Sequence, residues 1–234
     1  MELQALIFDV DGTLAETEDA HRRAFNQVFR EYGFDWTWGR DLYRDLLKVT
    51  GGRARIRHYL QGINAPQGDG DTTDALIREM HQRKNAVYAE LLAAGQVPLR
   101  PGIETLFRQA RTEGLRLAIA TTTSPENITA LLRNTLGEDS LNWFEAIGTG
   151  ASVKNLKPAP DVYLWVLEQL NLAPEACLAF EDSENGLRSS RATGIKTVVS
   201  PCLYTLGQNF SGAVKVVESL EGVNIAQLRR WHRG

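Results

Sequence analysis

Two aspartates close the first apolar segment of the chain. The sequence reads ALIFDVDGT from residue 5, so Asp9 and Asp11 follow an apolar run with one valine between them. Side chains of an extended strand alternate with a period of two, so we expect these two carboxylates to point the same way. Two acids that face one crevice repel each other unless a cation or a shared proton relieves them. The alternative is a strand that merely ends in a polar turn.

Three later segments carry chemically complementary groups. A second acidic pair ends the run ACLAFED, a lysine lies in the loop NLKPAPD, and hydroxyl residues follow the run LAIA: Glu181 and Asp182, Lys157, and Thr121, Thr122, Thr123 and Ser124. Carboxylates suit a hard cation, whereas hydroxyls at the start of a helix and a lysine suit phosphate oxygens. In this order the segments favour a phosphoryl-transfer site.

Short apolar runs alternate with helical patterns over most of the chain. The predicted strands are 5–10, 115–121, 145–150, 176–182, 196–200 and 213–217, and the predicted helices between them include 101–114, 124–136, 160–171 and 183–193. Nearly continuous apolar runs suit parallel strands covered on both faces. We therefore predict an α/β fold with a doubly wound parallel sheet, whose carboxyl edge brings the acids together.

One region breaks this alternation. Residues 16–95 contain no convincing strand, and AHRRAFNQVFREYG has the spacing of one apolar helix face. We predict an inserted helical domain at 16–95 and an α/β core from 1–15 and 96–234, with AAGQVPLRPG (93–102) as the return hinge. The segment QGDGDTTD (67–74) is interpreted as a mobile loop, because it lacks the length and closing acid of a calcium loop.

Composition excludes several classes of protein. The chain has 234 residues, 43% of them hydrophobic, and a net charge of −3, so the basic excess typical of nucleic-acid binding is absent. No apolar stretch has membrane-spanning length, and the N-terminus leads directly into a strand, so we expect a cytoplasmic protein with neither nucleic acid nor membrane as partner. Cys177 and Cys202 have no metal-site spacing and are interpreted as packing residues.

The motifs DVDGT, Thr121, KPAPD and EDS stand in the order found in the haloacid dehalogenase superfamily, which the chain resembles along nearly its whole length. The resemblance implies a core with a helical cap inserted after the first motif. It implies that Asp9 is the phosphorylated nucleophile and Asp11 the general acid/base. It also implies the following ligands: Thr121 and Lys157 for the phosphoryl group, and Asp9, the Asp11 carbonyl and Asp182, assisted by Glu181, for Mg²⁺.

Within that superfamily the chain is similar to the CbbY-like sugar-phosphate phosphatases. The matching segments are LAETEDAHRRAFN, LYRDLLKVTGGRARI, RPGI, ATTTS and SPCLYT. The resemblance implies hydrolysis of xylulose 1,5-bisphosphate, a Calvin-cycle role and a small-molecule sugar phosphate as partner. Separately, we expect a monomer. It also implies substrate contacts from cap residues: Glu18, His21, Tyr43, Gly51, Gly52, Arg53 and Arg55. A phosphomutase related to β-phosphoglucomutase is the alternative activity.

One position departs from the family pattern. Lysine usually follows the paired glycines, whereas this chain has Arg53, which binds phosphate as a planar fork. The alternative is that Arg53, Arg55 and Arg57 form a solvated helix face. His21 either orients the cap or is a satisfied helix residue, and Trp36 and Trp38 are interpreted as cap core.

Overall fold

The chain folds into two compact units. The computed structural model describes residues 2–49, 51–63 and 70–234. One unit comprises Met1–Thr17 and Val97–Gly234, and the other comprises Glu18–Gln96. Of the predicted loop at 67–74, residues 67–69 lie outside the described residues. Residues 70–74 belong to a helix, so the loop interpretation was wrong for them. Across the described ranges no helix is long and apolar enough to cross a membrane.

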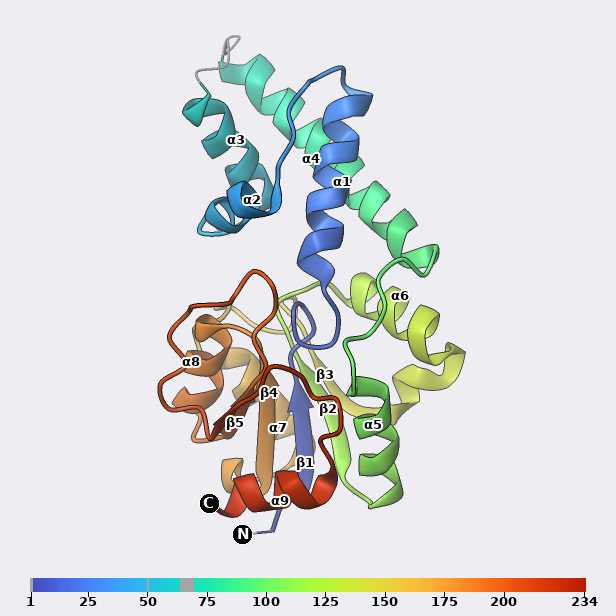
Figure 1. The fold of residues 1–234 in the computed structure, drawn as a ribbon, viewed down its shortest axis with the longest axis vertical. Helices are drawn as coiled ribbons and strands as arrows, with labels where there is room; N and C mark the ends of the chain where they lie inside the picture. The colour runs from blue at the N-terminus through green and yellow to red at the C-terminus, as the bar shows by residue number, and fades with distance from the viewer. Residues whose placement is uncertain (1, 50, 64–69) are drawn as a thin grey trace. The chain divides into compact units, whose positions relative to one another are not determined.

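The first unit is built on a parallel sheet. Within the described residues the strands are β1 (Ala5–Phe8), β2 (Arg116–Ala120), β3 (Phe144–Gly148), β4 (Cys177–Glu181), β5 (Lys196–Val199) and β6 (Lys215–Val216). They form one sheet in the order β3-β2-β1-β4-β5-β6, and every pair is parallel. This confirms the predicted doubly wound sheet, with β1 at its centre (Figure 1).

Helices and helical turns follow the strands of this unit. Their bounds are α5 (Ile103–Thr112), α6 (Pro125–Leu136), η1 (Glu138–Trp143), α7 (Asp161–Leu170), η2 (Pro174–Ala176), α8 (Glu184–Ala192) and α9 (Ile225–Arg233). Side-chain oxygens of Ser124, Ser183 and Asn224 cap the N-termini of α6, α8 and α9. Each cap satisfies a backbone N–H that the helix itself leaves open, which explains where these helices begin.

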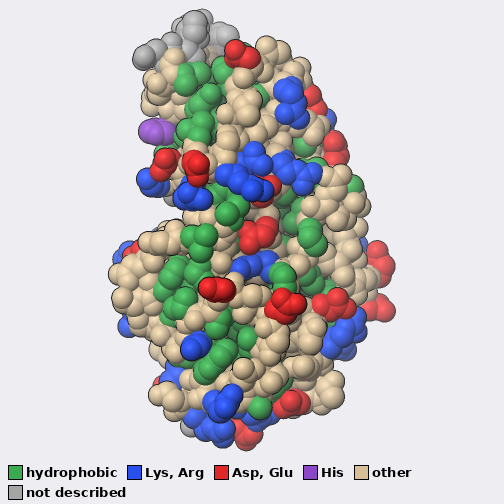
Figure 2. All heavy atoms as spheres, in the orientation of Figure 1, with side chains coloured by type: hydrophobic (Ala, Val, Ile, Leu, Met, Phe, Trp, Pro, Cys, Tyr) green, Lys and Arg blue, Asp and Glu red, His purple; other side chains and the backbone are tan. Residues whose placement is uncertain are grey.

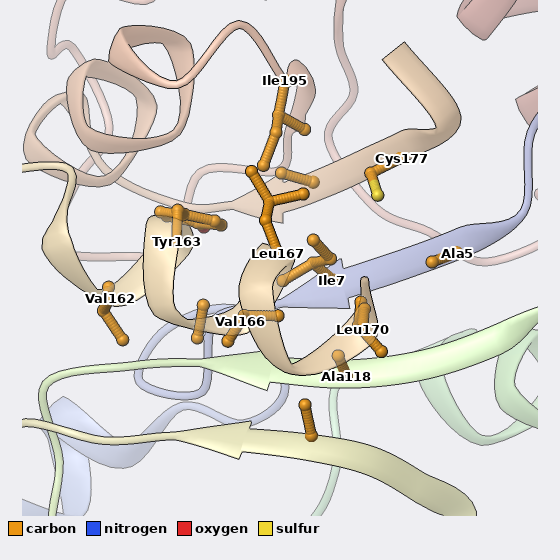
Figure 3. Close-up of a cluster of buried hydrophobic side chains, with 13 residues drawn as sticks. Ala5, Ile7, Ala118, Val162, Tyr163, Val166, Leu167, Leu170, Cys177 and Ile195 are labelled. Carbon is orange, nitrogen blue, oxygen red and sulfur yellow. The ribbon is translucent and has the colours of Figure 1, made fainter. Parts of the chain in front are cut away.

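The central strand β1 is apolar on both faces. Ile7 of β1 packs in a cluster with Val166 and Leu170 of α7 (Figure 3), whereas Phe8 lies against Phe107 of α5 with ring centroids 4.9 Å apart. Successive residues of a strand point to opposite faces, so a strand covered by helices on both sides must be apolar throughout. The continuous run at 5–8 meets this requirement.

The second unit is helical. It contains α1 (Thr17–Glu31), which starts at the boundary, α2 (Arg40–Leu46), α3 (Gly52–Gly62) and α4 (Gly70–Ala93). Trp38 is fully buried and packs against Phe25, Phe29 and Tyr59, which confirms its interpretation as core, and Trp36 stacks on Phe34. Acidic and basic side chains are interspersed over the face drawn in Figure 2, in line with the small net charge.

Candidate active site

Three buried acids meet at the carboxyl edge of the sheet. Asp9 follows β1, Glu181 ends β4 and Asp182 comes next. Phe8 pairs with Phe180 in the parallel register, so the acids that follow them emerge side by side. One oxygen from each acid lies within 4.8 Å of the others. The predicted convergence of Asp9 with Glu181 and Asp182 is confirmed.

Lys157 lies among these acids. Its Nζ donates to Asp9 Oδ1 at 2.7 Å, to Glu181 Oε1 at 2.6 Å and to the carbonyl oxygen of Ala120 at 2.8 Å. Burial alone would lower the pKa of Lys157, but the charges of Asp9 and Glu181 more than offset this and raise it. The lysine therefore remains a cation beside Asp9.

Glu181 has one occupied and one open oxygen. Tyr163 donates its hydroxyl to Oε1 at 2.5 Å, in addition to the bond from Lys157. Oε2 is buried, and no hydrogen-bond partner for it occurs among the residues that the structure describes. Gly186 makes room for this carboxylate, since a Cβ there would collide with it. Burial and the charge of Asp9 raise the pKa of Glu181 despite the nearby lysine.

Asp182 is held by a different loop. Thr205 donates its hydroxyl to Asp182 Oδ2 at 3.3 Å, and the thiol of Cys202 also hydrogen-bonds this carboxylate. Burial, followed by the charges of Asp9 and Glu181, raises the pKa of Asp182. Cys202 is buried, in agreement with its interpretation as a packing residue, and its thiol also contacts the Asp182 carboxylate. Cys177 is buried in the apolar cluster beneath α7, which confirms its interpretation as a packing residue.

The donor set at this edge fits a hard divalent cation. The three buried acids offer carboxylate oxygens, a ligand type that Mg²⁺ prefers. The buried Oε2 of Glu181 lacks a partner among the described residues, and the pKa values of Glu181 and Asp182 are raised. Both observations indicate negative charge that the protein's own groups do not fully compensate. A cation bound by Asp9, Glu181 and Asp182 would compensate it.

The backbone at Asp11 differs from our expectation. The strand ends at Phe8, so the alternation of side chains that was expected to align Asp11 with Asp9 does not extend that far. Asp11 instead lies in a turn, half-buried, where its backbone pairs with that of Ala15. Gly12 follows with a φ of 80°, a conformation that favours glycine. Asp11 is not part of the group of three buried acids.

The hydroxyl segment lies at the end of β2. Thr121 is fully buried, and its Oγ1 accepts a hydrogen bond from the Thr123 N–H at 3.3 Å. Ser124 caps α6 by accepting from Asn127 N, and Thr122 is exposed. The predicted combination of hydroxyls and a helix N-terminus is therefore present, which is a favourable environment for an anion.

The helical unit brings three of its predicted residues together. Tyr43 donates its hydroxyl to Glu18 Oε2 at 3.1 Å, and Arg55 donates to the Tyr43 hydroxyl at 3.2 Å. Arg55 also donates to the Leu46 carbonyl oxygen at 3.1 Å. The alternative that Arg55 belongs to a solvated helix face is wrong, because its guanidinium is fixed by these contacts.

Two histidines and a lysine adjoin this group. Lys84 Nζ lies 2.9 Å from His21 Nδ1, and a Cβ at Gly52 would lie 2.5 Å from His81 Nε2. Burial, and then the charge of Lys84, lowers the pKa of His21 and of His81, the latter to about 4. The charge of Arg55 adds to both shifts, and the charge of Arg53 adds to the shift of His81. We call this set the basic cluster: His21, Arg53, Arg55, His81 and Lys84.

Arg53 and Arg57 lie on the exposed side of α3. Both line an open groove with Asp74 and Arg78 of α4, and Arg57 forms an ion pair of 2.6 Å with Asp74. Arg53 also acts on His81 electrostatically. Gly51 caps α3 with a φ of 91°, so glycine is favoured at the position that precedes Gly52 and Arg53. The solvated-face interpretation therefore fits Arg57.

Comparison with known proteins decides the family. The model of the haloacid dehalogenase-like hydrolases matches residues 3–194. The chain belongs to this family. Because this is a family of hydrolases, the chain is an enzyme. The matched residues include Asp9, Thr121, Lys157 and Asp182, whose geometry is described above.

The relatives include CbbY proteins. The chain is 50% identical to protein CbbY of Rhodobacter capsulatus over 91% of this chain and 92% of the relative. It is 30% identical to a phosphorylated carbohydrates phosphatase of Thermotoga maritima, covering 95% and 98% of the two chains. A crystal structure of a CbbY mutant from Rhodobacter sphaeroides in complex with xylulose 1,5-bisphosphate has a TM-score of 0.83 and 42% identity, covering 97% and 99%.

Three residues that the sequence reasoning did not name contact predicted site residues of the hydrolase. Tyr163 contacts Glu181, Thr205 contacts Asp182, and Lys84 contacts His21. Tyr163 lies six residues after Lys157 in the chain, so its place on the helix after KPAPD was the available signal. For Lys84 the sequence offers no local signal, because its partner is separated from it by most of the helical unit.

Proposed function

We propose that this enzyme is a Mg²⁺-dependent phosphatase that hydrolyses xylulose 1,5-bisphosphate to xylulose 5-phosphate. The observation that carries the proposal is Lys157 Nζ between Asp9 and Glu181, beside Asp182. This arrangement combines a carboxylate nucleophile, a cation that offsets phosphate charge, and acids suited to a metal ion. The CbbY relatives and the sugar-bisphosphate complex support the substrate.

In the first step Asp9 attacks the phosphorus atom with a carboxylate oxygen. A P–O bond to Asp9 forms while the P–O bond to the sugar breaks, and the electron pair leaves with the sugar oxygen. Lys157 offsets the negative charge of the phosphoryl group, and the hydroxyl and backbone N–H groups at Thr121–Ser124 bind its oxygens. Thr121, Thr122, Thr123, Ser124 and Lys157 are therefore the proposed phosphate ligands.

Asp11 transfers the protons. It donates a proton to the departing sugar oxygen, and then accepts one from the water that attacks the phosphorus atom of the aspartyl phosphate. That second attack breaks the bond to Asp9 and releases inorganic phosphate. Acid/base assistance of this kind contributes about 10²- to 10⁴-fold to the rate.

Asp9, Asp182 and the Asp11 carbonyl, assisted by Glu181, are the proposed ligands of Mg²⁺. When bound, the ion neutralises phosphate charge and orients the phosphoryl group. The protein contributes the Thr205 and Cys202 hydrogen bonds that orient Asp182, and the Tyr163 and Lys157 bonds that orient Glu181. Hydrogen bonds to metal ligands from neighbouring residues fix the orientation of those ligands.

The helical unit supplies the proposed contacts to the rest of the substrate. We assign the second phosphate to Arg53 and to the backbone N–H groups at Gly51 and Gly52, and sugar contacts to Glu18, His21, Tyr43 and Arg55. The basic cluster supports this assignment, because burial and then the positive charges of Lys84 and Arg55 lower the pKa values of His21 and His81. A phosphate group would compensate that charge.

The test is release of inorganic phosphate from a panel of mono- and bisphosphorylated sugars, with and without Mg²⁺. We expect the highest kcat/KM with xylulose 1,5-bisphosphate, loss of activity in excess chelator, and loss in Asp182→Ala. Full activity in chelator would refute the metal role. Transfer of labelled phosphate between positions of one sugar, with little release, would establish the phosphomutase alternative instead.

A further inference from the structure

Arg100 lies where the chain returns from the helical unit to the core. Its backbone N–H donates to the Leu14 carbonyl oxygen at 2.7 Å, and the preceding residue, Leu99, forms an antiparallel bridge with Ala15. The outgoing and returning segments are therefore paired at this point. The side chain of Arg100 is only 11% exposed, so its charge is largely removed from water.

The guanidinium of Arg100 joins two loops at the carboxyl edge of the sheet. It donates to the carbonyl oxygen of Gly12, in the loop after β1, and to the carbonyl oxygens of Ser200 at 2.7 Å and Pro201 at 2.9 Å, in the loop after β5. A further bond of 3.2 Å reaches Ser200 Oγ, and Nε lies 3.3 Å from Glu16. One planar group thus bridges segments that are far apart in sequence.

These two loops enclose Asp182. A Cβ at Gly12 would collide with Asp182 Oδ2 and would lie 3.1 Å from Cys202 Sγ, so the first loop packs directly on the carboxylate and the thiol. From the second loop, Thr205 and Cys202 hydrogen-bond the same carboxylate. The orientation of Asp182 therefore depends on both loops keeping their separation.

We propose that Arg100 is a positioning residue for the acidic site: by holding the loops after β1 and β5 together, it fixes Asp182 for metal binding. This inference rests on the proposed metal role of Asp182. Arg100 touches none of the three acids, and it acts through the Gly12 and Ser200–Cys202 backbone. Its planar fork of donors reaches several carbonyl oxygens at once, a geometry that lysine does not reproduce.

The experiment compares Arg100→Met with Arg108→Met. Arg108 is an exposed arginine of α5 that pairs with Glu104 within its own helix, so it controls for loss of an arginine from the same unit. Binding of Mn²⁺, used as the probe for Mg²⁺, is measured by electron paramagnetic resonance. Hydrogen exchange is measured by mass spectrometry for peptides covering 10–16 and 200–206. Neither readout requires turnover.

We expect Arg100→Met to weaken Mn²⁺ binding by about 10- to 100-fold, the range for loss of outer contacts to metal ligands. Exchange should rise in both loop peptides and remain unchanged in β2. The Mn²⁺ affinity of Arg108→Met should stay within about twofold of that of the unmodified enzyme, because Arg108 supports no metal ligand. Binding by Arg100→Met within that same limit would overturn the proposal.

Arg100→Lys provides the second variant if Arg100→Met fails to fold. It keeps the positive charge and loses the fork, so a folded Arg100→Lys enzyme should still show weaker Mn²⁺ binding and faster exchange in both loops. Unchanged binding and exchange would refute the role of Arg100. Absence of phosphate release by the unmodified enzyme would refute the proposed function alone, because the binding comparison does not depend on it.

Discussion

The acidic site of the core and the basic cluster of the helical unit are built in different ways. In the core, Asp9 and Glu181 follow directly from neighbouring parallel strands, so backbone register determines their separation. In the helical unit, His21, Arg55 and Lys84 come from three helices, and side-chain packing determines where they meet. The first arrangement follows from topology, and the second depends on details of packing.

The two regions also carry opposite charge imbalances. Burial and neighbouring acids raise the pKa of Asp182, whereas burial and the charge of Lys84 lower the pKa of His81. Each region would be stabilised by a ligand of the opposite sign. For the proposed reaction those ligands are a metal cation at the acids and a phosphate dianion at the basic cluster. Variants can test the two regions separately.

The largest effect is expected at Asp9. Asp9→Asn removes the nucleophile with almost no change in volume, and loss of a nucleophile costs at least about 10⁴-fold in kcat. The measurement is phosphate release under saturating Mg²⁺, with circular dichroism to verify the fold. Asp139→Asn, an exposed change in the same unit, should retain normal activity. Activity of Asp9→Asn within tenfold of the unmodified enzyme would contradict the nucleophile assignment.

A smaller and more selective effect is expected at Arg53. Charge-assisted hydrogen bonds contribute about 1.5 to 3 kcal/mol, so Arg53→Ala should lower kcat/KM for xylulose 1,5-bisphosphate by roughly tenfold to a hundredfold. Hydrolysis of a small monophosphate should barely change. Arg57→Ala is the matched control, because Arg57 lines the same groove but is paired with Asp74. Equal losses on both substrates would mean that Arg53 supports the structure of the helical unit.

The smallest effect is expected in the pH dependence of stability. The pKa of His81 is about 4 in the folded protein, against 6.5 for an unperturbed histidine, so the unfolded state binds more protons between these values. The free energy of unfolding should therefore fall as the pH drops from about 6.5 to about 4. Because the ring is partly exposed, we expect His81 to account for about 1 to 2 kcal/mol of this fall in the free energy of unfolding.

Urea denaturation across this pH range measures the effect. His81→Gln cannot gain the proton, so its stability should fall less steeply with acid than that of the unmodified enzyme. Gln82→Asn, an exposed and non-titrating change on α4, should leave the slope unaltered. Identical slopes for the unmodified enzyme and His81→Gln would show that His81 is not buried among cations as described.

The sequence predicted the core well because its signals are local. Continuous apolar runs identified the strands, and the acids at their ends identified the edge where Asp9 and Asp182 meet. The backbone conformation at Asp11 could not be predicted in the same way, because the strand ends before it and its backbone pairs with Ala15. The contact of Cys202 with Asp182 was not predicted, because Asp182 comes from another loop.

In the helical unit, spacing predicted helices but did not separate the arginines of α3. Arg53 and Arg55 stand two residues apart, yet Arg55 bonds to Tyr43 and the Leu46 carbonyl while Arg53 lines a groove beside α4. Residues at this spacing lie on different sides of a helix. Which side meets which neighbour depends on the packing of α2 and α4, and a single helix pattern carries no information about that.

The bridge between Ala15 and Leu99 has a consequence for evolution and engineering. The two ends of the helical insert leave the core as adjacent antiparallel segments, so the insert is topologically one long hairpin loop. The entropy cost of closing a loop grows only logarithmically, and doubling its length costs about 0.6 kcal/mol. The core can therefore accept inserts of very different size at this junction while the strands that carry Asp9 and Glu181 remain unchanged.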